Sequence, residues 1–528
     1  MSQTSIGPAD FEGSFTDVLD EAFERFADRE CVAFGQRRLT YADVDRTSAQ
    51  VANALIAAGF EAGMKAAVYS LNSDLAFITT VGIVRGGGVW LPVNPRNSEG
   101  DNVDTVVHLG CDVLFYQHQF VNAADAVRAR CPGLKAFVVM DSGAEAGRTT
   151  LDEWMAGAST RAPDVPLKGT DLVSIPTTGG TTGQPKGVML SHRNFRALAH
   201  ASRHDFLAPG AVMLCAAPMT HVGGRLAMTA LSSGARLVVL DKVDPQLVLH
   251  TIQQERITDV FLPPTAIYSL LDQQNLDSFD LSSLRNVGYG SAPMSIERLR
   301  EALVRLGPVM RGGFGQTECP MFITAMSPAE HYIDGKIAPD ERLGSVGRAT
   351  SISQVSILDD NGDPLPVRQR GEIAVRGGNV SEGYYGSPEE TAAIRCKGWH
   401  LTGDVGYLDE EGYLHIVDRR KDMIISGGFN VYSAEVEQAL MQLPGVRFAA
   451  VIGIPSEKWG EEVKAFVQLA GGCHWTEEAV IEACRQRLGG VKTPKTVEFV
   501  DELPFSPIGK LDKKRLRAPY WKDRSRSI

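Results

Sequence analysis

Residues 177–187 read Thr-Thr-Gly-Gly-Thr-Thr-Gly-Gln-Pro-Lys-Gly and follow a short apolar run at residues 172–175. The first seven positions hold three glycines and four threonines, which offer backbone N–H and hydroxyl donors without bulky side chains. Such a loop can wrap around phosphate oxygens, and Lys186 adds a positive charge beside it. It is not a Walker A loop, because Gly187 follows the lysine, and it is not a G-x-G-x-x-G motif. A plain surface turn is the alternative interpretation of the Gly and Thr content alone.

The regions on either side of this loop alternate short aliphatic runs with longer helical patterns. Four runs have the length of buried strands, at residues 66–70, 112–116, 136–140 and 236–240. Apolar residues recur every three or four positions in two longer stretches, which predicts amphipathic helices at residues 41–58 and 245–254. Strands separated by helices predict an α/β fold with mixed, largely parallel sheets.

The pattern changes twice toward the C-terminus. Residues 344–412 hold many Gly and Pro turns between short alternating runs, which predicts a β-rich, antiparallel subdomain. After the charged residues 419–422 the pattern becomes compact α+β, with helices expected at residues 433–442 and 476–488 and strands at 448–453 and 464–469. We therefore predict a large N-terminal domain, residues 1–419, and a small, mobile α+β C-terminal domain, residues 420–528.

The composition excludes several classes of protein. Of the 528 residues, 43% are apolar and 22% are charged, which is typical of a globular chain and not of a disordered or coiled-coil one. Asp and Glu outnumber Lys and Arg by 64 to 53, and the net charge of -11 repels nucleic-acid backbones. The basic residues between 513 and 526 suit a solvated terminal helix better than a nucleic-acid site.

The sequence also indicates a cellular compartment. Eight cysteines are scattered without a C-x-x-C pair, a pattern that suits reduced thiols. The opening residues lack the basic and apolar regions of a signal peptide. No apolar stretch reaches the roughly 18 residues that a membrane-spanning helix needs. We therefore expect a soluble, cytoplasmic protein without a transmembrane segment.

Five further motifs follow the Thr/Gly loop along the chain. They are Gly290-Ser-Ala-Pro-Met-Ser, Phe314-Gly-Gln-Thr-Glu, Trp399-His-Leu-Thr-Gly-Asp, Asp418-Arg-Arg-Lys-Asp and Pro507-Ile-Gly-Lys. Taken singly, these motifs have plain structural interpretations. Residues 314–318 could form a turn, Asp404 could cap a turn, residues 418–422 could be a surface charge cluster, and Lys510 could be an exposed tail lysine. Taken together in this order, they resemble the adenylate-forming superfamily of acyl-CoA synthetases, peptide-synthetase adenylation domains and beetle luciferases. The acyl-CoA synthetase branch is the most similar.

The resemblance implies a binding site for ATP. In this family the Thr/Gly loop handles the phosphates, an aromatic residue stacks on adenine, and an aspartate binds the ribose. Carried over position by position, the nucleotide-contacting residues are Thr177, Thr178, Gly179, Gly180, Thr181, Thr182, Gly183, Lys186, Gly290, Ser291, Ala292, Phe314, Gly315, Gln316, Thr317, Asp404, Ile416, Arg419 and Lys510.

The resemblance also implies a reaction in two steps. The carboxylate of an acid attacks the α-phosphorus of ATP and releases pyrophosphate, and the acyl-adenylate then passes to the thiol of CoA. The implied catalytic residues are Lys510, Thr178, His221 and Glu318. Of these, Thr178 and Glu318 would hold Mg²⁺, which prefers hard oxygen ligands.

Family behaviour further implies that the C-terminal domain alternates between two orientations. The domain rotates about a hinge, which corresponds here to Lys421. It presents Lys510 for adenylation and then opens a path for the pantetheine of CoA, lined by Ser426, Gly427 and Gly428.

The identity of the acid depends on the residues that line its pocket. By family position these are His221, Val222, Gly223, Gly224, Gly288, Gly312 and Gly313. The glycines are expected to leave space and supply no ionic anchor. The stretch of residues 218–225 also lacks the aspartate with which peptide-synthetase domains hold an amino group. We therefore predict a bulky apolar monocarboxylic acid, either a medium- or long-chain fatty acid or an aryl or alicyclic acid.

Two alternatives to a stand-alone acyl-CoA synthetase stay open at this point. One is an acyl-AMP ligase that loads a separate carrier protein. The other is a catalytically silent nucleotide-binding homologue, against which the intact Glu318, Asp404, Arg419 and Lys510 argue. The resemblance leaves the oligomeric state open, and a homodimer is compatible with it.

Overall fold

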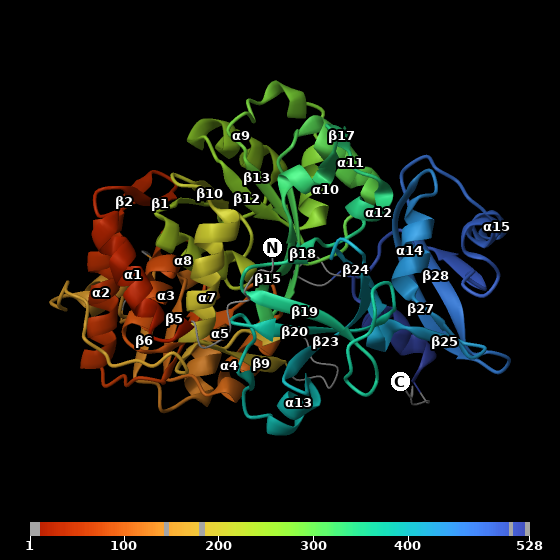
Figure 1. The fold of residues 1–528 in the computed structure, drawn as a ribbon. Coiled ribbons are helices and arrows are strands. Elements are labelled where there is room, and N and C mark those ends of the chain that lie inside the picture. The colour runs from red at the N-terminus through yellow and green to blue at the C-terminus, as the bar shows by residue number, and fades with distance from the viewer. Residues whose placement is uncertain (1–10, 142–146, 179–184, 506–510, 523–528) are drawn as a thin grey trace.

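The computed structural model describes residues 11–141, 147–178, 185–505 and 511–522 (Figure 1). A large N-terminal part holds two mostly parallel sheets with surrounding helices, a five-stranded antiparallel sheet and a small two-stranded one, and a small C-terminal part lies beside it, blue in Figure 1. This arrangement confirms the α/β fold with a β-rich subdomain that the sequence predicts. No helix in the described ranges is long and apolar enough to cross a bilayer.

The first sheet has nine strands, and its central strands are parallel. Antiparallel strands complete it at both edges. The predicted run at residues 236–240 is one of the central strands. In spatial order the sheet consists of β18 (Arg348–Ala349), β15 (Cys319–Met326), β14 (Met310–Gln316), β13 (Asn286–Tyr289), β12 (Asp259–Leu262), β10 (Val212–Cys215), β11 (Arg236–Val239), β1 (Glu30–Phe34) and β2 (Arg37–Thr40).

The second sheet has eight strands and contains the strands that flank the Thr/Gly loop. Its strands are β21 (Gly383–Tyr384), β9 (Lys186–Ser191), β7 (Leu172–Ser174), β4 (Val89–Val93), β3 (Lys65–Tyr69), β5 (Val113–Tyr116) and β6 (Ala136–Val139), with β8 (Thr177–Thr178) paired to β9. Parallel pairing joins β7, β4, β3, β5 and β6, whereas β9 runs antiparallel to β7, β8 and β21. The three aliphatic runs predicted as strands before residue 141 are β3, β5 and β6.

Helices surround the two sheets, and their ends follow local capping signals. The predicted helix at residues 41–58 is α2 (Tyr41–Ala57), which Thr40 and Asp43 start with a capping box. The one predicted at 245–254 is α9 (Pro245–Glu255), with Asp244 as N-cap. The other helices of the large domain are α1 (Phe15–Arg25), α3 (Asp74–Arg85), α4 (Glu99–Leu109), α5 (Val121–Arg130), α6 (Leu151–Met155), α7 (His192–Ala201), α8 (Val222–Ala230), α10 (Pro264–Leu271), α11 (Ile296–Arg305), α12 (Asp340–Leu343) and α13 (Pro388–Ala393).

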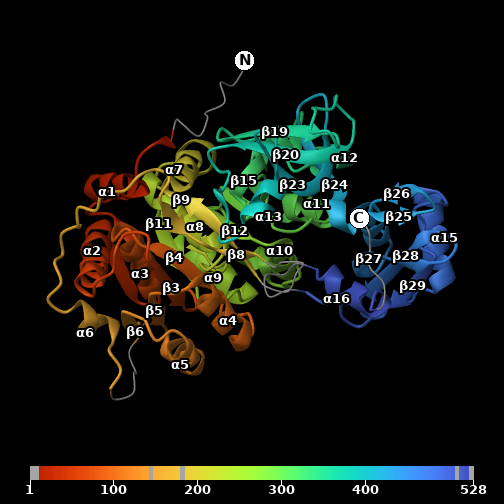
Figure 2. The same cartoon turned by 90° about the horizontal axis from the view of Figure 1, so that it is seen from below.

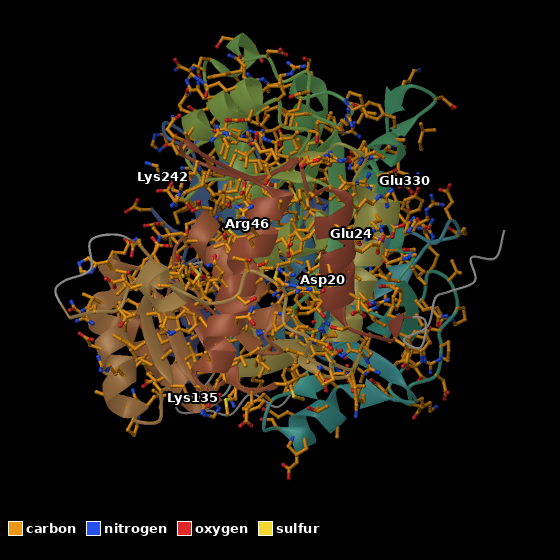
Figure 3. All side chains as sticks on the ribbon, turned by 90° about the vertical axis from the view of Figure 1, so that its left-hand side faces the viewer. Asp20, Glu24, Arg46, Lys135, Lys242 and Glu330 are labelled. Carbon is orange, nitrogen blue, oxygen red and sulfur yellow. The ribbon has the colours of Figure 1, made fainter. Side chains whose placement is uncertain are left out.

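Helices α1 and α2 form part of the outer surface, and Figure 3 shows Asp20, Glu24 and Arg46 among their side chains. Beneath them the buried Arg85, at the end of α3, pairs with Asp20 at 2.8 Å and with Asp45 at 2.7 Å. A buried guanidinium is costly unless carboxylates compensate it, so these ion pairs join α1, α2 and α3.

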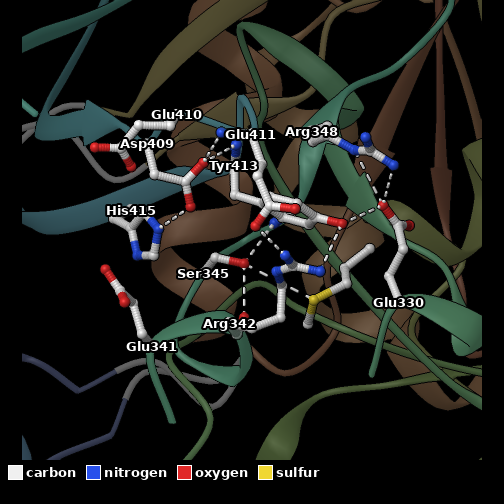
Figure 4. Close-up of polar contacts among 12 residues, drawn as sticks. Glu330, Glu341, Arg342, Ser345, Arg348, Asp409, Glu410, Glu411, Tyr413 and His415 are labelled. Atoms are coloured by element: carbon white, nitrogen blue, oxygen red, sulfur yellow. Dashed lines mark hydrogen bonds and ion pairs between the residues drawn. The ribbon is translucent and has the colours of Figure 1, made fainter. Parts of the chain in front are cut away.

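The antiparallel subdomain predicted for residues 344–412 is a five-stranded sheet. It consists of β19 (Ser353–Leu358), β20 (Gly371–Gly377), β23 (Trp399–Leu408), β22 (Arg395–Cys396) and β24 (Leu414–Arg419). A polar cluster fixes it to the nine-stranded sheet (Figure 4). In this cluster Tyr413 donates to Glu330 at 2.9 Å, and Glu330 also pairs with Arg348 at 2.7 Å. The strand that leads to the hinge, β24, is thereby held in place.

The C-terminal domain has its own sheet and its own hydrophobic core. The strands are β26 (Phe429–Val431), β25 (Ile424–Ser426), β28 (Gly460–Leu469), β27 (Val446–Ser456) and β29 (Thr496–Phe499), and the helices are α14 (Ser433–Met441), α15 (Glu477–Leu488) and α16 (Lys513–Arg517). Both predicted helices and both predicted strands of this region are present. The core contains only residues from Ile424 onward, among them the fully buried Leu440. The domain boundary at residue 419 stays a prediction.

This separate core predicts that a cavity in α14 destabilises the C-terminal domain alone. Leu440→Ala should lower the free energy of its local unfolding by about 2–5 kcal/mol, because a buried leucine leaves a cavity. Hydrogen exchange read peptide by peptide should show faster exchange in residues 424–499 and unchanged exchange in β10–β13. Val491→Ala is the control, since Val491 is 44% exposed. Equal acceleration in both parts would show that the two cores unfold together.

Candidate active site

The Thr/Gly loop is carried by a β-hairpin. Thr177 pairs with Gly187 and Thr178 with Lys186, so β8 and β9 close the segment between them. A Cβ atom on Gly187 would lie 2.6 Å from Ile175 Cγ2, so the hairpin packs against the preceding strand only with glycine at this position. Residues 179–184 lie outside the described residues, and the phosphate-contacting role of Gly179, Gly180, Thr181, Thr182 and Gly183 stays a prediction.

A tyrosine joins this hairpin to the Phe-Gly-Gln-Thr-Glu motif. Tyr384 of β21 pairs with Val188 of β9, and its hydroxyl donates to Glu318 Oε1 at 2.7 Å. Burial and the neighbouring Glu318 raise the pKa of Tyr384, so the hydroxyl keeps the proton that it donates. The Lys186 ammonium lies 5.1 Å from the centre of the Tyr384 ring and 2.6 Å from Glu390 Oε1. Segments that are far apart in sequence therefore meet at Tyr384.

These residues fit a magnesium ion that also binds phosphate. Glu318 supplies a carboxylate, and one of its oxygens accepts a hydrogen bond from Tyr384. Thr178, at the end of β8, supplies a hydroxyl group where the Thr/Gly loop begins. The described residues contain no group of three or more His, Cys, Asp or Glu side chains that could enclose a metal. Mg²⁺ commonly binds one or two carboxylates and completes its coordination with substrate phosphates and water.

The segment predicted to line adenine lies between two parallel strands. β13 leads to Gly290, Ser291 and Ala292, and β14 runs into residues 314–317. A Cβ atom on Gly290 would lie 2.8 Å from Gly313 O, and one on Gly315 would lie 1.8 Å from Met321 O. Both glycines therefore permit close backbone contacts. Ser291 has a φ of +66°, a conformation that few non-glycine residues adopt outside functional turns.

A histidine that the sequence analysis missed fixes the next motif residue. Gln316 Nε2 lies 2.9 Å from Nε2 of the buried His400. Burial, followed by the charge of Arg395, lowers the pKa of His400 to about 3, so the ring is neutral and Nε2 accepts the amide proton. His400 lies within the Trp399 motif, but only the pairing of distant strands reveals its partner.

The predicted ribose and nucleotide residues lie opposite each other at one end of the antiparallel sheet. Asp404 of β23 pairs with Arg419 of β24, and Asp404 Oδ1 lies 3.6 Å from Arg419 Nε. Ile416 lies on the same strand as Arg419, opposite Gly406. The Arg419 side chain is half-exposed and Asp404 is mostly buried.

The predicted hinge and the predicted CoA path come directly after Arg419 along the chain. Lys421 lies in a short turn between β24 and β25, where burial and then the Arg419 charge lower its pKa. Ser426 is buried, while Gly427 and Gly428 are exposed and have φ values of +58° and +81°. Gly427 donates its N–H to Trp459 O at 2.8 Å, and a Cβ atom on Gly427 would lie 2.9 Å from the Trp459 ring. Glycine at this position therefore allows the aromatic ring to pack on the hairpin.

The acid-pocket glycines do not leave the open space that the sequence analysis expects. A Cβ atom on Gly223 would lie 2.5 Å from Ala217 O, and one on Gly224 would lie 1.9 Å from Met219 O. These glycines allow the start of α8 to pack against the preceding turn. His221 is the N-cap of α8, and its N–H donates to Pro218 O at 3.0 Å.

Two glycines of the predicted acid pocket, on β13 and β14, also leave no open space beside them. A Cβ atom on Gly312 would lie 2.7 Å from the Tyr289 hydroxyl, and one on Gly288 would lie 3.2 Å from the Phe261 ring. Tyr289 is itself fixed, because its hydroxyl lies 2.9 Å from His331 Nε2. Aromatic side chains therefore occupy the space beside these two glycines.

The surroundings of α8 hold two small cavities and one buried cation. A cavity of about 20 Å³ lies beside Gly224, and one of about 10 Å³ lies beside Gly223. Neither is larger than about one water molecule. Arg225 is only 3% exposed, its Nε and Nη1 have no hydrogen-bond partner among the described residues, and burial lowers its pKa to about 10. Arg225 therefore adds a buried positive charge to a stretch for which the sequence analysis noted only the missing aspartate.

The structure thus joins Glu318 to the strands that carry the Thr/Gly loop and places Asp404 beside Arg419. Tyr384, Glu390 and His400 were missed, because their partners lie far away in the sequence. Lys510 lies outside the described residues, and its catalytic role stays a prediction.

Two family models match the chain. One, described as AMP-binding enzyme, covers residues 19–385, and the other, described as the AMP-binding enzyme C-terminal domain, covers residues 435–510. The chain belongs to the AMP-binding enzyme family. This match confirms the resemblance that the ordered motifs indicate.

Individual relatives of this AMP-binding enzyme are CoA ligases, which confirms the predicted branch. It is 33% identical to the medium/long-chain-fatty-acid–CoA ligase FadD8 of Mycobacterium tuberculosis, over 97% of this chain and 91% of that protein. It is 35% identical to the feruloyl-CoA synthase of an Amycolatopsis species, over 93% and 95% of the two chains. The crystal structure of ATP-bound MatB from Rhodopseudomonas palustris superimposes with a TM-score of 0.86 at 31% identity, covering 97% and 99% of the chains.

The Tyr384 contact generates a prediction about magnesium. Tyr384→Phe should raise the Mg²⁺ concentration required for half-maximal pyrophosphate release by about tenfold, because a hydrogen bond to a charged carboxylate contributes about 1.5 kcal/mol. Tyr385→Phe is the matched control, since its hydroxyl bonds to Lys65 at 3.1 Å instead. An unchanged Mg²⁺ dependence in Tyr384→Phe would exclude the proposed role of the tyrosine in orienting Glu318.

The tight contact at Gly224 generates a second prediction. Gly224→Ala should force the start of α8 away from Met219 and raise the KM for the acid by about tenfold or more, since misplacement by about 1 Å can be that costly. Gly100→Ala is the control, because nothing lies within 4 Å of its added methyl group. The measurement is steady-state kinetics with the best acid substrate. A wild-type KM in Gly224→Ala would separate this helix from acid binding.

Proposed function

We propose that this chain is an ATP-dependent acid–CoA ligase that forms an acyl-adenylate and acts on a bulky monocarboxylic acid. The observation that carries this proposal is the contact through Tyr384, which joins the strand after the Thr/Gly loop to Glu318. A loop that binds phosphates and a carboxylate that binds a metal ion can act on the same nucleotide only if both face it. The family membership and the CoA ligases among the relatives support the same chemistry.

The reaction proceeds by two displacements. A carboxylate oxygen of the acid attacks the α-phosphorus of ATP, the bond to the β-phosphate oxygen breaks, and pyrophosphate leaves. The sulfur of CoA then attacks the acyl carbon, and AMP leaves with the electrons of the acyl–oxygen bond. Lys510 would neutralise negative charge that develops in the first step. Bound Mg²⁺, held by Glu318 and Thr178, would neutralise charge on the phosphates.

The family resemblance carries the remaining assignments, and the described geometry supports them. Asp404 and Arg419 would bind the ribose and the nucleotide, Phe314 would stack on adenine, and Gln316 would be oriented by His400. His221 and Val222 lie at the start of α8, where the acid would bind. The eight cysteines, all free thiols, support a reducing cytoplasm as the site of action. Association into a homodimer stays a prediction.

Arg225 favours a second class of acid. A guanidinium that is buried on the predicted acid-binding helix, with no carboxylate paired to it in the described part of the chain, suits a substrate with a second oxygen acceptor, such as a ketone or another carboxylate. Acids with and without such a group therefore belong in the same assay panel. Higher kcat/KM for the oxygenated members would favour this class over purely apolar acids.

The deciding experiment measures pyrophosphate, AMP and acyl-CoA with Mg·ATP and a panel of acids, with and without CoA. Lys510→Ala should lower pyrophosphate release about 100-fold or more, because an electrostatic contact to the transition state is lost, and should still bind a preformed adenylate. Pyrophosphate release that stalls at the adenylate despite CoA would indicate a carrier protein as acceptor. A wild-type chain that binds ATP but converts none of the acids would contradict the proposal.

A further inference from the structure

Helix α16 begins shortly after Lys510, and its first residue enters a buried polar cluster. Lys513 Nζ lies 2.7 Å from Glu437 Oε1 of α14 and donates to Ser433 Oγ at 2.7 Å. The side chains of Lys513 and Glu437 are only 13% and 12% exposed. An ion pair so shielded from water and shared with a hydroxyl group is a specific contact, unlike most surface ion pairs.

The cluster continues to the strand that precedes the hinge. Ser433 donates both its Oγ, at 2.8 Å, and its N–H to Asp418 Oδ2. Asp418 belongs to β24 of the antiparallel sheet, whereas Ser433 begins α14 of the C-terminal domain. Lys513 is therefore connected through Ser433 to the residue directly before Arg419.

A second contact of α16 reaches the other side of the hinge. Arg517 Nη2 lies 2.8 Å from Asp422 Oδ1, within the turn that contains Lys421. Lys513 and Arg517 are four residues apart, so they lie on one face of the helix. This face of α16 thus reaches Asp422 directly and Asp418 through Ser433, at the two ends of the hinge segment, residues 418–422. We call these contacts, made by Lys513, Arg517, Ser433, Glu437, Asp418 and Asp422, the hinge clamp.

Burial makes Lys513 the central charge of the hinge clamp. Burial raises the pKa of Glu437 to about 7 and also raises the pKa of Asp418, and in both cases the Lys513 charge opposes the shift. Two buried carboxylates thus depend on one ammonium group for compensation. Removing one partner of such a cluster is costly, because it leaves charge buried without compensation.

The same contacts hold the ends of the chain segment that carries Lys510. Phe505 and Leu511 form an antiparallel bridge, and Asp512 donates its N–H to Pro504 O at 2.8 Å. Leu511 and Asp512 then lead directly into α16. The position of α16 therefore sets where the two ends of this segment lie relative to the hinge.

We propose that Lys513 is a positioning residue for adenylation: through the hinge clamp it fixes α16, and with it the attachment of Lys510, to the hinge. The inference rests on the proposed function, which assigns Lys510 to the first half-reaction. The second half-reaction, attack of the CoA thiol on the adenylate, does not use Lys510. Loss of the clamp should therefore affect the two half-reactions unequally, whereas a general loss of folding would affect both.

The test measures the two half-reactions separately in the full-length enzyme with its best acid. Lys513→Met should lower single-turnover pyrophosphate release by about 10- to 100-fold, since small misplacements of a reacting group have effects of this size. It should leave AMP release from a preformed acyl-adenylate and CoA within about threefold of wild type, and Lys513→Arg should restore part of the lost adenylation by keeping the charge. Lys522→Met is the control, because Lys522 is exposed, and should stay within about twofold in both steps.

Two results would overturn the positioning role. One is wild-type adenylation in Lys513→Met, and the other is an equal loss of both half-reactions in a variant that is folded by circular dichroism. If Lys513→Met does not fold, Glu437→Gln decides by the same criteria, since it removes the negative charge that Lys513 faces on α14 and keeps Lys513 and its contact with Ser433. A wild-type enzyme that makes no acyl-CoA would instead refute the proposed function, so the two failures are distinguishable.

Discussion

Strand β9 is hydrogen-bonded on both sides, and the candidate active site depends on this pairing. On one side β7 and β8 place the Thr/Gly hairpin, and on the other side β21 places Tyr384. Because strands in a sheet lie about 5 Å apart, this pairing brings the hairpin close to Glu318, which Tyr384 binds. The β14–β15 hairpin, which carries Glu318, belongs to the other large sheet. The site is therefore built where the two sheets meet.

The C-terminal domain depends on a different kind of contact. Its main core contains only residues from Ile424 onward and shares no described buried residue with the cores of the large domain. Charged and hydroxyl groups around Asp418 and Asp422 connect it to the end of β24. Polar contacts of this kind are directional, and they can be exchanged for water without exposing a hydrophobic core. This suits a domain that is expected to change its orientation between two half-reactions.

The glycines near α8 show why composition alone misjudges a pocket. A glycine leaves space only if no neighbouring atom fills it, and here the carbonyl groups of Ala217 and Met219 and the Tyr289 hydroxyl fill it. These glycines serve close packing of backbone against helix and strand. Arg225, one residue further along the helix, gives this region a buried positive charge instead. The space beside these glycines is thus set by groups that fold against them, which the glycines themselves do not reveal.

The sequence by itself determined the α/β class, the order of the motifs and the ends of α2 and α9, because caps and hydrophobic periodicity act between residues close along the chain. It also predicted which residues bear the chemistry, since Glu318, Asp404 and Arg419 lie in recognisable motifs. Only the tertiary structure decided what these residues contact. Tyr384 at Glu318, His400 at Gln316 and Lys513 at Glu437 each join segments more than sixty residues apart. Such contacts follow from strand order and domain packing, which local sequence patterns do not encode.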